Sequence, residues 1–307
     1  MRIVFMGTPE FAIPSLRSLV ENHVDVVGVV TVPDKPVGRG QQLSPSLVKQ
    51  YALQHDLPVY QPEKLRDPGF IRQLSEIEPD IFVIVAFRIL PPEVFKIPKY
   101  GSFNLHASLL PNYRGAAPIN WAIIHGEKET GVTTFFLQET IDTGNVILQA
   151  RLPIGDDETA GELHDRLAEL GAETVRQTVR LIEAGTAKTV QQDNSLASPA
   201  PKIFKEHCRI DWAKSKEEVH NFVRGLSPRP CAFTFHGTNQ IRVYRTRVIG
   251  QFQEAAPGEI RQADRQLVVS TGTGVVEITE LQQEGKKRLA AEEFLRGYRL
   301  TVGEKFA

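Results

Sequence analysis

The sequence predicts an α/β fold with a mainly parallel sheet, followed by a smaller β-rich domain. Continuous apolar segments alternate with segments of helical spacing through the first half, as expected for a sheet that helices cover on both faces. Beyond the stretch from Ser198 to Pro201, the pattern changes to short strand-like pieces separated by Gly, Pro and Asn. A chain of 307 residues is also too long for one ordinary hydrophobic core, so two domains are expected.

The elements of the first domain follow from short apolar runs and their spacing. Leu16, Leu19 and Val20 lie at helical spacing soon after the first strand-like run. A longer pattern predicts a helix from 159 to 184, with Gly185 as its C-cap. Strands are predicted over residues 3–6, 24–30, 58–60, 80–86 and 102–106, and a β-rich stretch over 131–152.

The second domain is predicted to be a small barrel or open sheet. A short helix over 217–224 precedes its strands, which are predicted over 232–235, 241–248, 266–270 and 275–281. The resulting boundaries are 1–190 for the first domain, 191–204 for a linker and 205–307 for the second domain.

Composition excludes several classes of protein. No run approaches the roughly 20 apolar residues of a membrane span, and the apolar run at the N-terminus is too short for a signal peptide. The two cysteines, Cys208 and Cys231, form no zinc or disulfide pattern, so we expect no metal and a reducing, cytoplasmic location. The net charge is −1, but residues 201–307 hold 18 basic and 13 acidic side chains, a weak hint of nucleic acid.

Two polar side chains share one face at the end of a predicted strand. Asn104 and His106 stand at i and i+2, and in parallel sheets sites lie at the carboxyl ends of the strands. Asp142, in a turn from Thr140 to Gly144, could orient the imidazole. An amide donor, a proton acceptor and an orienting carboxylate are the groups needed to move an acyl group onto an amine.

Simpler interpretations of these motifs stay open from the residues alone. A single histidine is usually a hydrogen-bonded structural residue, and Asp-Thr-Gly is usually only a turn. Gly7-Thr8-Pro9-Glu10-Phe11-Ala12 follows the first strand but lacks the second and third glycines of a dinucleotide-binding motif, which favours a structural strand-to-helix turn.

A long loop is expected from Thr31 to Ser46, without secondary structure of its own. Loops of this length are uncommon in compact domains and tend to be functional. Lys35 and Arg39, flanked by glycine and proline, could contact phosphates, although a solvated loop without such a role is the alternative.

Taken together, these residues resemble the methionyl-tRNA formyltransferase family over essentially the whole chain. The resemblance implies a Rossmann-like catalytic domain followed by an OB-like barrel that helps to hold tRNA. It implies formyl transfer from 10-formyltetrahydrofolate to the α-amino group of methionyl initiator tRNA by a monomer, with no metal. The segments that carry it are Gly7–Pro9, Pro33–Pro36, Gly38–Gly40, Asn104–His106, Ser108–Pro111, Arg114–Pro118 and Asp142–Gly144.

The resemblance assigns roles to individual residues. Asn104, His106 and Asp142 match the site that folate-dependent formyltransferases share, so they specify the chemistry but not the acceptor. The acceptor is indicated by the basic loop and by Arg209–Trp212, Arg242–Arg245 and Gly285–Lys287. The residues expected to contact folate are Phe87, Ile89, Leu90, Ser108, Leu109, Leu110 and Pro111, and those expected to contact tRNA are Lys35, Arg39, Arg242, Arg245, Lys286 and Lys287.

One segment departs from the family pattern. The family usually carries Ala-Tyr-Gly-Leu-Ile-Leu-Pro where this chain has Ala86-Phe87-Arg88-Ile89-Leu90-Pro91, one residue shorter and without the glycine. That loop lines the folate pocket in the family, so the departure raises the question of where Arg88 points.

Two rival functions are open to the same residues. One is a formyltransferase acting on a nucleotide sugar amine or on glycinamide ribonucleotide, against which the basic loop and barrel count. The other is a non-catalytic RNA-binding protein on a decayed enzyme fold, against which the intact Asn-His-Asp set counts.

Overall fold

The computed structural model describes residues 1–37, 42–250 and 255–307. The chain folds into two compact units. The first consists of Met1–Gly115, Thr130–Leu152 and His164–Pro199, and the second of Ala116–Glu129, Pro153–Leu163 and Ala200–Ala307. The boundaries at 190 and 204, with a linker between them, stay a prediction.

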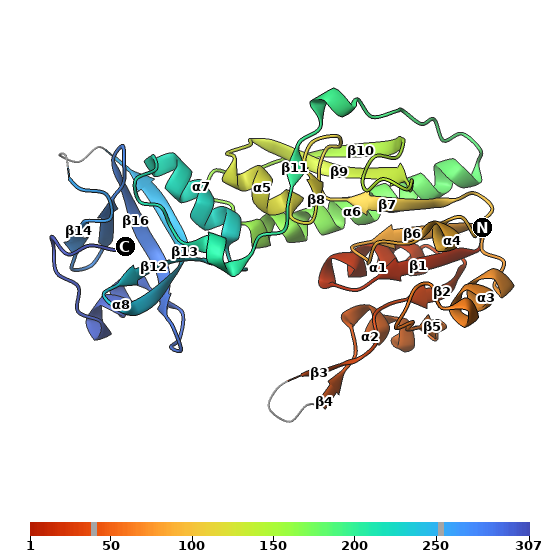
Figure 1. The fold of residues 1–307 in the computed structure, drawn as a ribbon, viewed down its shortest axis with the longest axis horizontal. Coiled ribbons are helices and arrows are strands. Elements are labelled where there is room, and N and C mark those ends of the chain that lie inside the picture. Colours follow the sequence, from red (N-terminus) through yellow and green to blue (C-terminus); the bar gives the residue numbers. More distant parts are fainter. Residues whose placement is uncertain (38–41, 251–254) are drawn as a thin grey trace. The chain divides into compact units, whose positions relative to one another are not determined.

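A seven-stranded sheet forms the centre of the first unit, in the order β10-β9-β7-β6-β1-β2-β5 (Figure 1). The five strands from β7 to β5 are parallel, whereas β9 is antiparallel to β7. The predicted mainly parallel sheet is therefore confirmed. The strands are β1 (Ile3–Gly7), β2 (Val26–Val30), β5 (Val59–Tyr60), β6 (Ile81–Val85), β7 (Ser102–His106), β9 (Glu129–Phe136) and β10 (Val146–Pro153).

Helices pack on both faces of this sheet. Val4 and Met6 of β1 lie in a buried cluster with Phe70 of α3 and Val94 of α4. Leu105 of β7 points the other way, against the long helix α6, where a side chain on Gly171 would come within 2.6 Å of Leu105. The helices are α1 (Ile13–Glu21), α2 (Leu47–Gln54), α3 (Pro68–Glu76), α4 (Pro92–Phe95) and α6 (Ala160–Glu183).

This arrangement decides on which face the predicted site lies. Successive residues of a strand point to opposite faces of a sheet. Because Leu105 faces α6, Asn104 and His106 face away from it, on the side of the sheet that carries α3 and α4.

The segment from Thr31 to Ser46 differs from the prediction. Within it, β3 (Lys35–Val37) pairs antiparallel with β4 (Gln42–Ser44), so the expectation of a loop without secondary structure is wrong. Short strands are predicted from alternating apolar and polar residues. This segment is rich in Gly and Pro, so that pattern did not reveal its hairpin. Arg39 lies outside the described residues.

The second unit contains an antiparallel sheet in the order β12-β13-β16-β15-β14, with β17 beside β16. Its strands agree with the predicted ones, except that β14 and β17 were not expected. Helices α5 (Pro118–Ile124), α7 (Lys216–Leu226) and α8 (Ala291–Gly297) belong to the same unit. The strands are β12 (Ala232–His236), β13 (Asn239–Ile249), β14 (Ile260–Ala263), β15 (Leu267–Ser270), β16 (Val275–Gln283) and β17 (Leu289–Ala290).

The last residues of the chain join the two edges of this sheet. Ala307 exchanges two backbone hydrogen bonds with Phe235 of β12, of 2.9 and 3.0 Å, while Glu304 accepts from Ile260 of β14 at 2.8 Å. Phe306 donates to Gly258, which has φ +81° and leaves no room for a side chain because Phe306 O would lie 2.3 Å from it. Joining both edge strands closes the sheet into a barrel, as the OB-like prediction requires.

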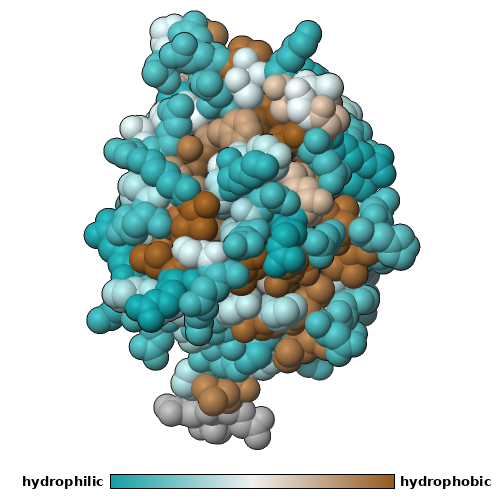
Figure 2. Space-filling model, turned by 90° about the vertical axis from the view of Figure 1, so that its right-hand side faces the viewer, coloured by the Kyte–Doolittle hydropathy of each residue, from teal (hydrophilic) through white to brown (hydrophobic). Residues whose placement is uncertain are grey.

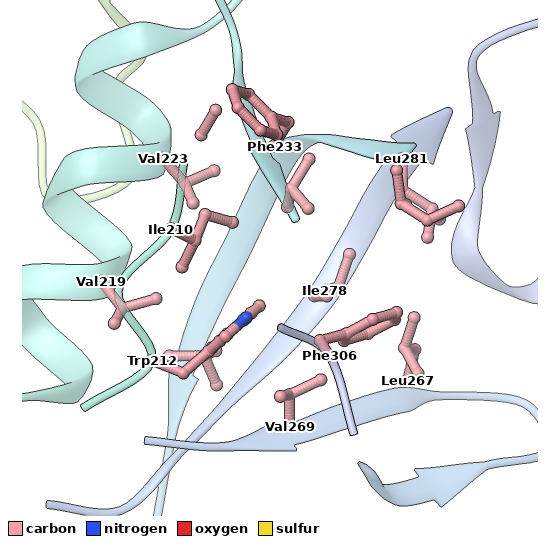
Figure 3. Close-up of a cluster of buried hydrophobic side chains, with 14 of the residues drawn as sticks. Ile210, Trp212, Val219, Val223, Phe233, Leu267, Val269, Ile278, Leu281 and Phe306 are labelled. Atoms are coloured by element: carbon pink, nitrogen blue, oxygen red, sulfur yellow. The ribbon is translucent and has the colours of Figure 1, made fainter. Parts of the chain in front are cut away.

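The barrel encloses one hydrophobic core (Figure 3). Trp212 stacks on Phe306 with ring centroids 6.1 Å apart, and its indole N–H donates to Thr234 Oγ1 at 3.0 Å. Helix α7 covers this core with Val219 and Val223 and begins with a capping box formed by Ser215 and Glu218.

Hydrophobic residues on the surface are interrupted by hydrophilic ones on the face shown in Figure 2. Within the described residues, no helix has the length and apolar character needed to cross a membrane.

Candidate active site

Asn104 and His106 lie on the last residues of β7, with neighbouring strands on both sides. Asn104 pairs with Ile84 of β6 and with Phe135 of β9, while His106 pairs with Thr133 of β9. In a strand the two Cα atoms are about 6.6 Å apart and both side chains point to one face. Asn104 is partly exposed, and no described residue hydrogen-bonds its carboxamide. The carboxamide is therefore available to a ligand.

His106 is buried and lies between two oxygen atoms. Its Nε2 is 2.8 Å from the carbonyl oxygen of Tyr113, and its Nδ1 is 3.9 Å from Asp142 Oδ2. A carbonyl oxygen only accepts hydrogen bonds, so Nε2 carries the proton of the neutral ring and Nδ1 carries the lone pair. The distance of 3.9 Å is too long for a hydrogen bond. The Tyr113 carbonyl therefore orients the ring, although no motif in the sequence singled it out.

Asp142 is held in place by the backbone of a second loop. The N–H of Gly115 donates to Asp142 Oδ2 at 2.9 Å, and the Asp142 side chain is only 12% exposed. Gly144 in the same turn packs directly on the backbone of Phe136, where a Cβ would lie 1.6 Å from the carbonyl oxygen. The tight turn that the sequence predicted is thus required to bring this carboxylate to the end of β7.

The segment from Ser108 to Pro111 is tied to β9 and β10. Thr133 of β9 donates to the Ser108 carbonyl at 2.6 Å and accepts from the Leu110 N–H at 3.0 Å, and Gln149 of β10 donates to the Leu110 carbonyl at 2.8 Å. Leu110 is 5% exposed, and its peptide bond to Pro111 is cis. The loop next to His106 is therefore held by side chains that sequence reasoning did not select.

The shortened loop after β6 has a defined arrangement. Arg88 donates to the carbonyl oxygens of Pro62 at 2.8 Å and Glu63 at 3.0 Å, and burial lowers the pKa of its guanidinium. Its guanidinium also lies 5.3 Å from the centre of the Phe87 ring. Arg88 thus packs against the segment before α3. Ile89 is 73% exposed, whereas Leu90 turns into the core beside Val94.

The cations predicted to contact tRNA fall into two groups. Arg242 and Arg245 are half-buried and paired: Arg242 lies 3.8 Å from Glu284, and Arg245 contacts Glu162 and lies 3.7 Å from Glu280. The exposed group consists of Lys35 on β3 and of Lys286 and Lys287 between β16 and β17.

The chain matches two family models. Residues 1–179 match the formyl transferase family, and residues 202–299 match its C-terminal domain. A methionyl-tRNA formyltransferase from Geobacter sulfurreducens is 48% identical over 99% of this chain and 96% of its own length. One from Bacteroides fragilis is also 48% identical, over 99% of this chain and 97% of its own length.

Solved structures share the fold at lower identity. An N-formyltransferase from Helicobacter canadensis, solved with folinic acid and dTDP-3-aminofucose, has a TM-score of 0.69 and 24% identity, covering 92% of this chain and 98% of its own. A methionyl-tRNA formyltransferase from Clostridium thermocellum has a TM-score of 0.57 and 15% identity, covering 81% of this chain and 94% of its own. The two family models and the full-length relatives place the chain in the formyl transferase family, among the methionyl-tRNA formyltransferases.

Proposed function

We propose that this protein transfers the formyl group of 10-formyltetrahydrofolate to the α-amino group of methionine esterified to initiator tRNA. The observation that carries the proposal is the arrangement at the end of β7. His106 lies between a carbonyl and a carboxylate, and Asn104, with a carboxamide available to a ligand, projects from the same face.

The nucleophile needs little activation. An α-amino group has a reference pKa of about 7.7–8.0, and the ester lowers it further, so much of the amine is neutral at pH 7. The enzyme's task is therefore to align the amine with the formyl carbon and to stabilise the tetrahedral intermediate.

Asn104 is suited to stabilise the oxyanion. When the amine nitrogen attacks, the formyl oxygen gains negative charge, and an amide N–H of Asn104 donates to it. An oxyanion donor of this kind contributes about 2.7–4 kcal/mol to the transition state. The Asn104 carboxamide has no hydrogen-bonding partner among the described residues, so it breaks no bond within the protein before it donates to the oxyanion.

His106 is suited to carry the proton through Nδ1. Because Nε2 donates to the Tyr113 carbonyl, Nδ1 is the nitrogen that can accept the proton of the attacking amine. The resulting imidazolium lies between the Tyr113 carbonyl and the Asp142 carboxylate, and both oxygens attract its positive charge. The proton then passes to N10 of the folate as the bond from carbon to N10 breaks.

The folate would supply the activated formyl group, and the loops beside His106 would hold it. Phe87 and the exposed Ile89 are available as apolar contacts on one loop, and the partly exposed Leu109 and Pro111 lie on the other. Leu90, Leu110 and Ser108 are buried, and the Ser108 hydroxyl donates to the Asn112 carbonyl at 2.6 Å, so we expect these three to support the loops from beneath.

Cations of the β3–β4 hairpin and the barrel would hold the tRNA backbone. Exchanging both Lys286 and Lys287 for Ala should reduce the slope of log K against log salt for tRNA by about two, with Lys188→Ala as an exposed control. An unchanged slope would show that these two lysines do not contact the tRNA.

We further propose that the protein acts as a monomer in the cytoplasm, where charged tRNA is found. Light scattering with and without tRNA tests whether it is a monomer.

The decisive experiment is formyl transfer from 10-formyltetrahydrofolate to charged initiator Met-tRNA, with charged elongator Met-tRNA and free methionine as controls. Turnover on the initiator alone is expected. Turnover on amino sugars or small nucleotides, with none on any Met-tRNA, would overturn the proposed acceptor while leaving the chemistry in place.

A further inference from the structure

The two groups beside His106 both sit on backbone that needs outside support. Tyr113, whose carbonyl accepts from Nε2, has φ +61°, and Asp142, whose carboxylate faces Nδ1, has φ +56°. Residues other than glycine rarely adopt this left-handed region, and such conformations persist only where the surroundings impose them. Other residues must therefore hold Tyr113 and Asp142 where His106 needs them.

Gln192 holds the Asp142 turn. Its side chain is buried, at 6% exposure, although it lies in the segment predicted to be a linker. The Nε2 group donates to the carbonyl of Asp142 at 2.9 Å and to the carbonyl of Gly144 at 2.8 Å. The two hydrogen bonds hold the first and last residues of the Asp-Thr-Gly turn, so they help to determine where the Asp142 carboxylate points.

The same side chain also reaches the loop that carries Tyr113. Gln192 Oε1 accepts from Arg114 Nε at 3.2 Å and from Arg114 Nη2 at 2.7 Å. Arg114 Nη2 additionally donates to Asn194 Oδ1 at 2.8 Å. Arg114 follows Tyr113 directly, so Gln192 connects the two loops that flank the imidazole.

Ser198 completes the support a few residues later. Its Oγ accepts from the Tyr113 N–H at 2.9 Å, and its carbonyl accepts from the Arg114 N–H at 2.9 Å. The segment from Gln192 to Ser198 is thus hydrogen-bonded to Tyr113, to Asp142 and to Arg114.

We propose that Gln192, with Ser198 as its second support, is a positioning residue that sets the Asp142 carboxylate and the Tyr113 carbonyl on the two nitrogens of His106. The proposal rests on the role assigned to His106 above. Residues 192–198 belong to the first unit, and in this proposal they brace its site.

The chemistry of the glutamine side chain explains why this residue type is needed. Gln192 uses two N–H donors on carbonyl oxygens and one oxygen on a guanidinium. An ionised glutamate has the same shape and keeps the acceptor, but it has no donor and would repel both carbonyls. Methionine fills the same space and keeps neither. The pair of substitutions therefore separates the donors to the Asp142 turn from the acceptor for Arg114.

The test compares Gln192→Glu and Gln192→Met with Gln191→Glu and Gln191→Met, since Gln191 is an exposed glutamine one residue earlier. We expect both Gln192 variants to lower kcat by about 10- to 100-fold, as small misplacements of reacting groups do, with KM for folate and for tRNA within twofold. The Gln191 variants should match the wild type. A kcat within twofold of the wild type in folded Gln192→Met would overturn the proposal. If Gln192→Met does not fold, Ser198→Ala replaces it, with a smaller loss of kcat expected and no loss overturning the proposal.

A double-mutant cycle shows whether Gln192 acts through His106. In a His106→Ala background, Gln192→Met should cost less than twofold further in single-turnover rate, because its target is already absent. A full additional loss would mean that Gln192 acts elsewhere, and the proposal would fail. The two proposals fail through different results. Normal turnover in His106→Ala alone would overturn the role of His106, whereas an unchanged rate in Gln192→Met alone would overturn only the role of Gln192.

Discussion

Two buried histidines, one in each unit, have nearly the same exposure but different surroundings. His106 at the end of β7 is 7% exposed, and His220 on α7 is 6% exposed. His220 has hydrogen-bonding partners on both ring nitrogens: Nδ1 lies 3.0 Å from Thr246 Oγ1, and Nε2 lies 3.1 Å from the Asp156 carbonyl. Among the described residues, His106 has a hydrogen-bonding partner on Nε2 only, and its Nδ1 lies 3.9 Å from a carboxylate oxygen.

The difference shows that burial alone does not identify a histidine that moves protons. A ring with both nitrogens bonded has no free position for a substrate proton, and His220 also faces the guanidinium of Arg224. Burial and Arg224 lower the pKa of His220, so the ring stays neutral, while the Asp156 carbonyl and Asp157 act in the opposite direction. A ring with one nitrogen anchored and the other without a hydrogen bond can accept a proton and remain oriented. A nearby carboxylate does not make this difference, because Asp157 Oδ1 also lies 3.5 Å from Nε2 of His220.

The largest effect that tests this comparison is on turnover. His106→Ala should lower kcat by about 10²- to 10⁴-fold, because it removes the proton acceptor. Its free energy of unfolding should fall by about 1–3 kcal/mol, because the Tyr113 carbonyl loses its buried donor, so kcat is measured on the folded fraction. Near-normal turnover in the purified variant would break the comparison.

Asn104→Ala is expected to have the next largest effect. Removing the oxyanion donor should lower kcat by about 10²- to 10³-fold with little change in KM. Asn104→Asp is the matched variant, because it keeps the size and loses the N–H donors. Rate measurements on both variants should agree, and an active Asn104→Asp would show that the carboxamide donates nothing to the reaction.

His220→Leu should affect stability and not chemistry. The change leaves Thr246 Oγ1 and the Asp156 carbonyl without their partner, at a cost of about 1–3 kcal/mol in the free energy of unfolding. The kcat of the folded fraction should equal that of the wild type. A loss of kcat as large as that of His106→Ala would contradict the structural role.

The smallest expected effect is the dependence of stability on pH. The pKa of His220 is lowered in the folded protein, so as the pH falls below about 6.5 the unfolded chain binds the proton first. The contribution to stability is therefore complete above that pH and is lost as the pH falls toward the folded-state pKa. Urea unfolding between pH 7.5 and 5 should show a shallower pH dependence in His220→Leu than in the wild type, with His23→Leu, an exposed histidine, behaving like the wild type.

Several features were determined by the sequence alone, because they depend on local spacing. Apolar runs and helical periodicity predicted the parallel strands, the helix now seen as α6 and its C-cap at Gly185, whose φ is +65°. Alternation along β7 predicted that Asn104 and His106 share a face, since side chains in a strand have a period of two. The motifs also predicted the family to which the chain belongs.

Other features were decided only by the tertiary structure, because they depend on residues far apart in the chain. Tyr113 and Asp142 meet His106 through loops that Gln192 and Ser198 hold, and no spacing rule reports such contacts. The resemblance to the family predicted that the loop after β6 lines the folate pocket. In the structure, Arg88 on this loop donates to the carbonyls of Pro62 and Glu63, and Leu90 packs into the core. The barrel closes through a C-terminal segment that has no hydrophobic alternation of its own. Its position follows from the unpaired edges of β12 and β14, where backbone groups need partners that only the folded chain supplies.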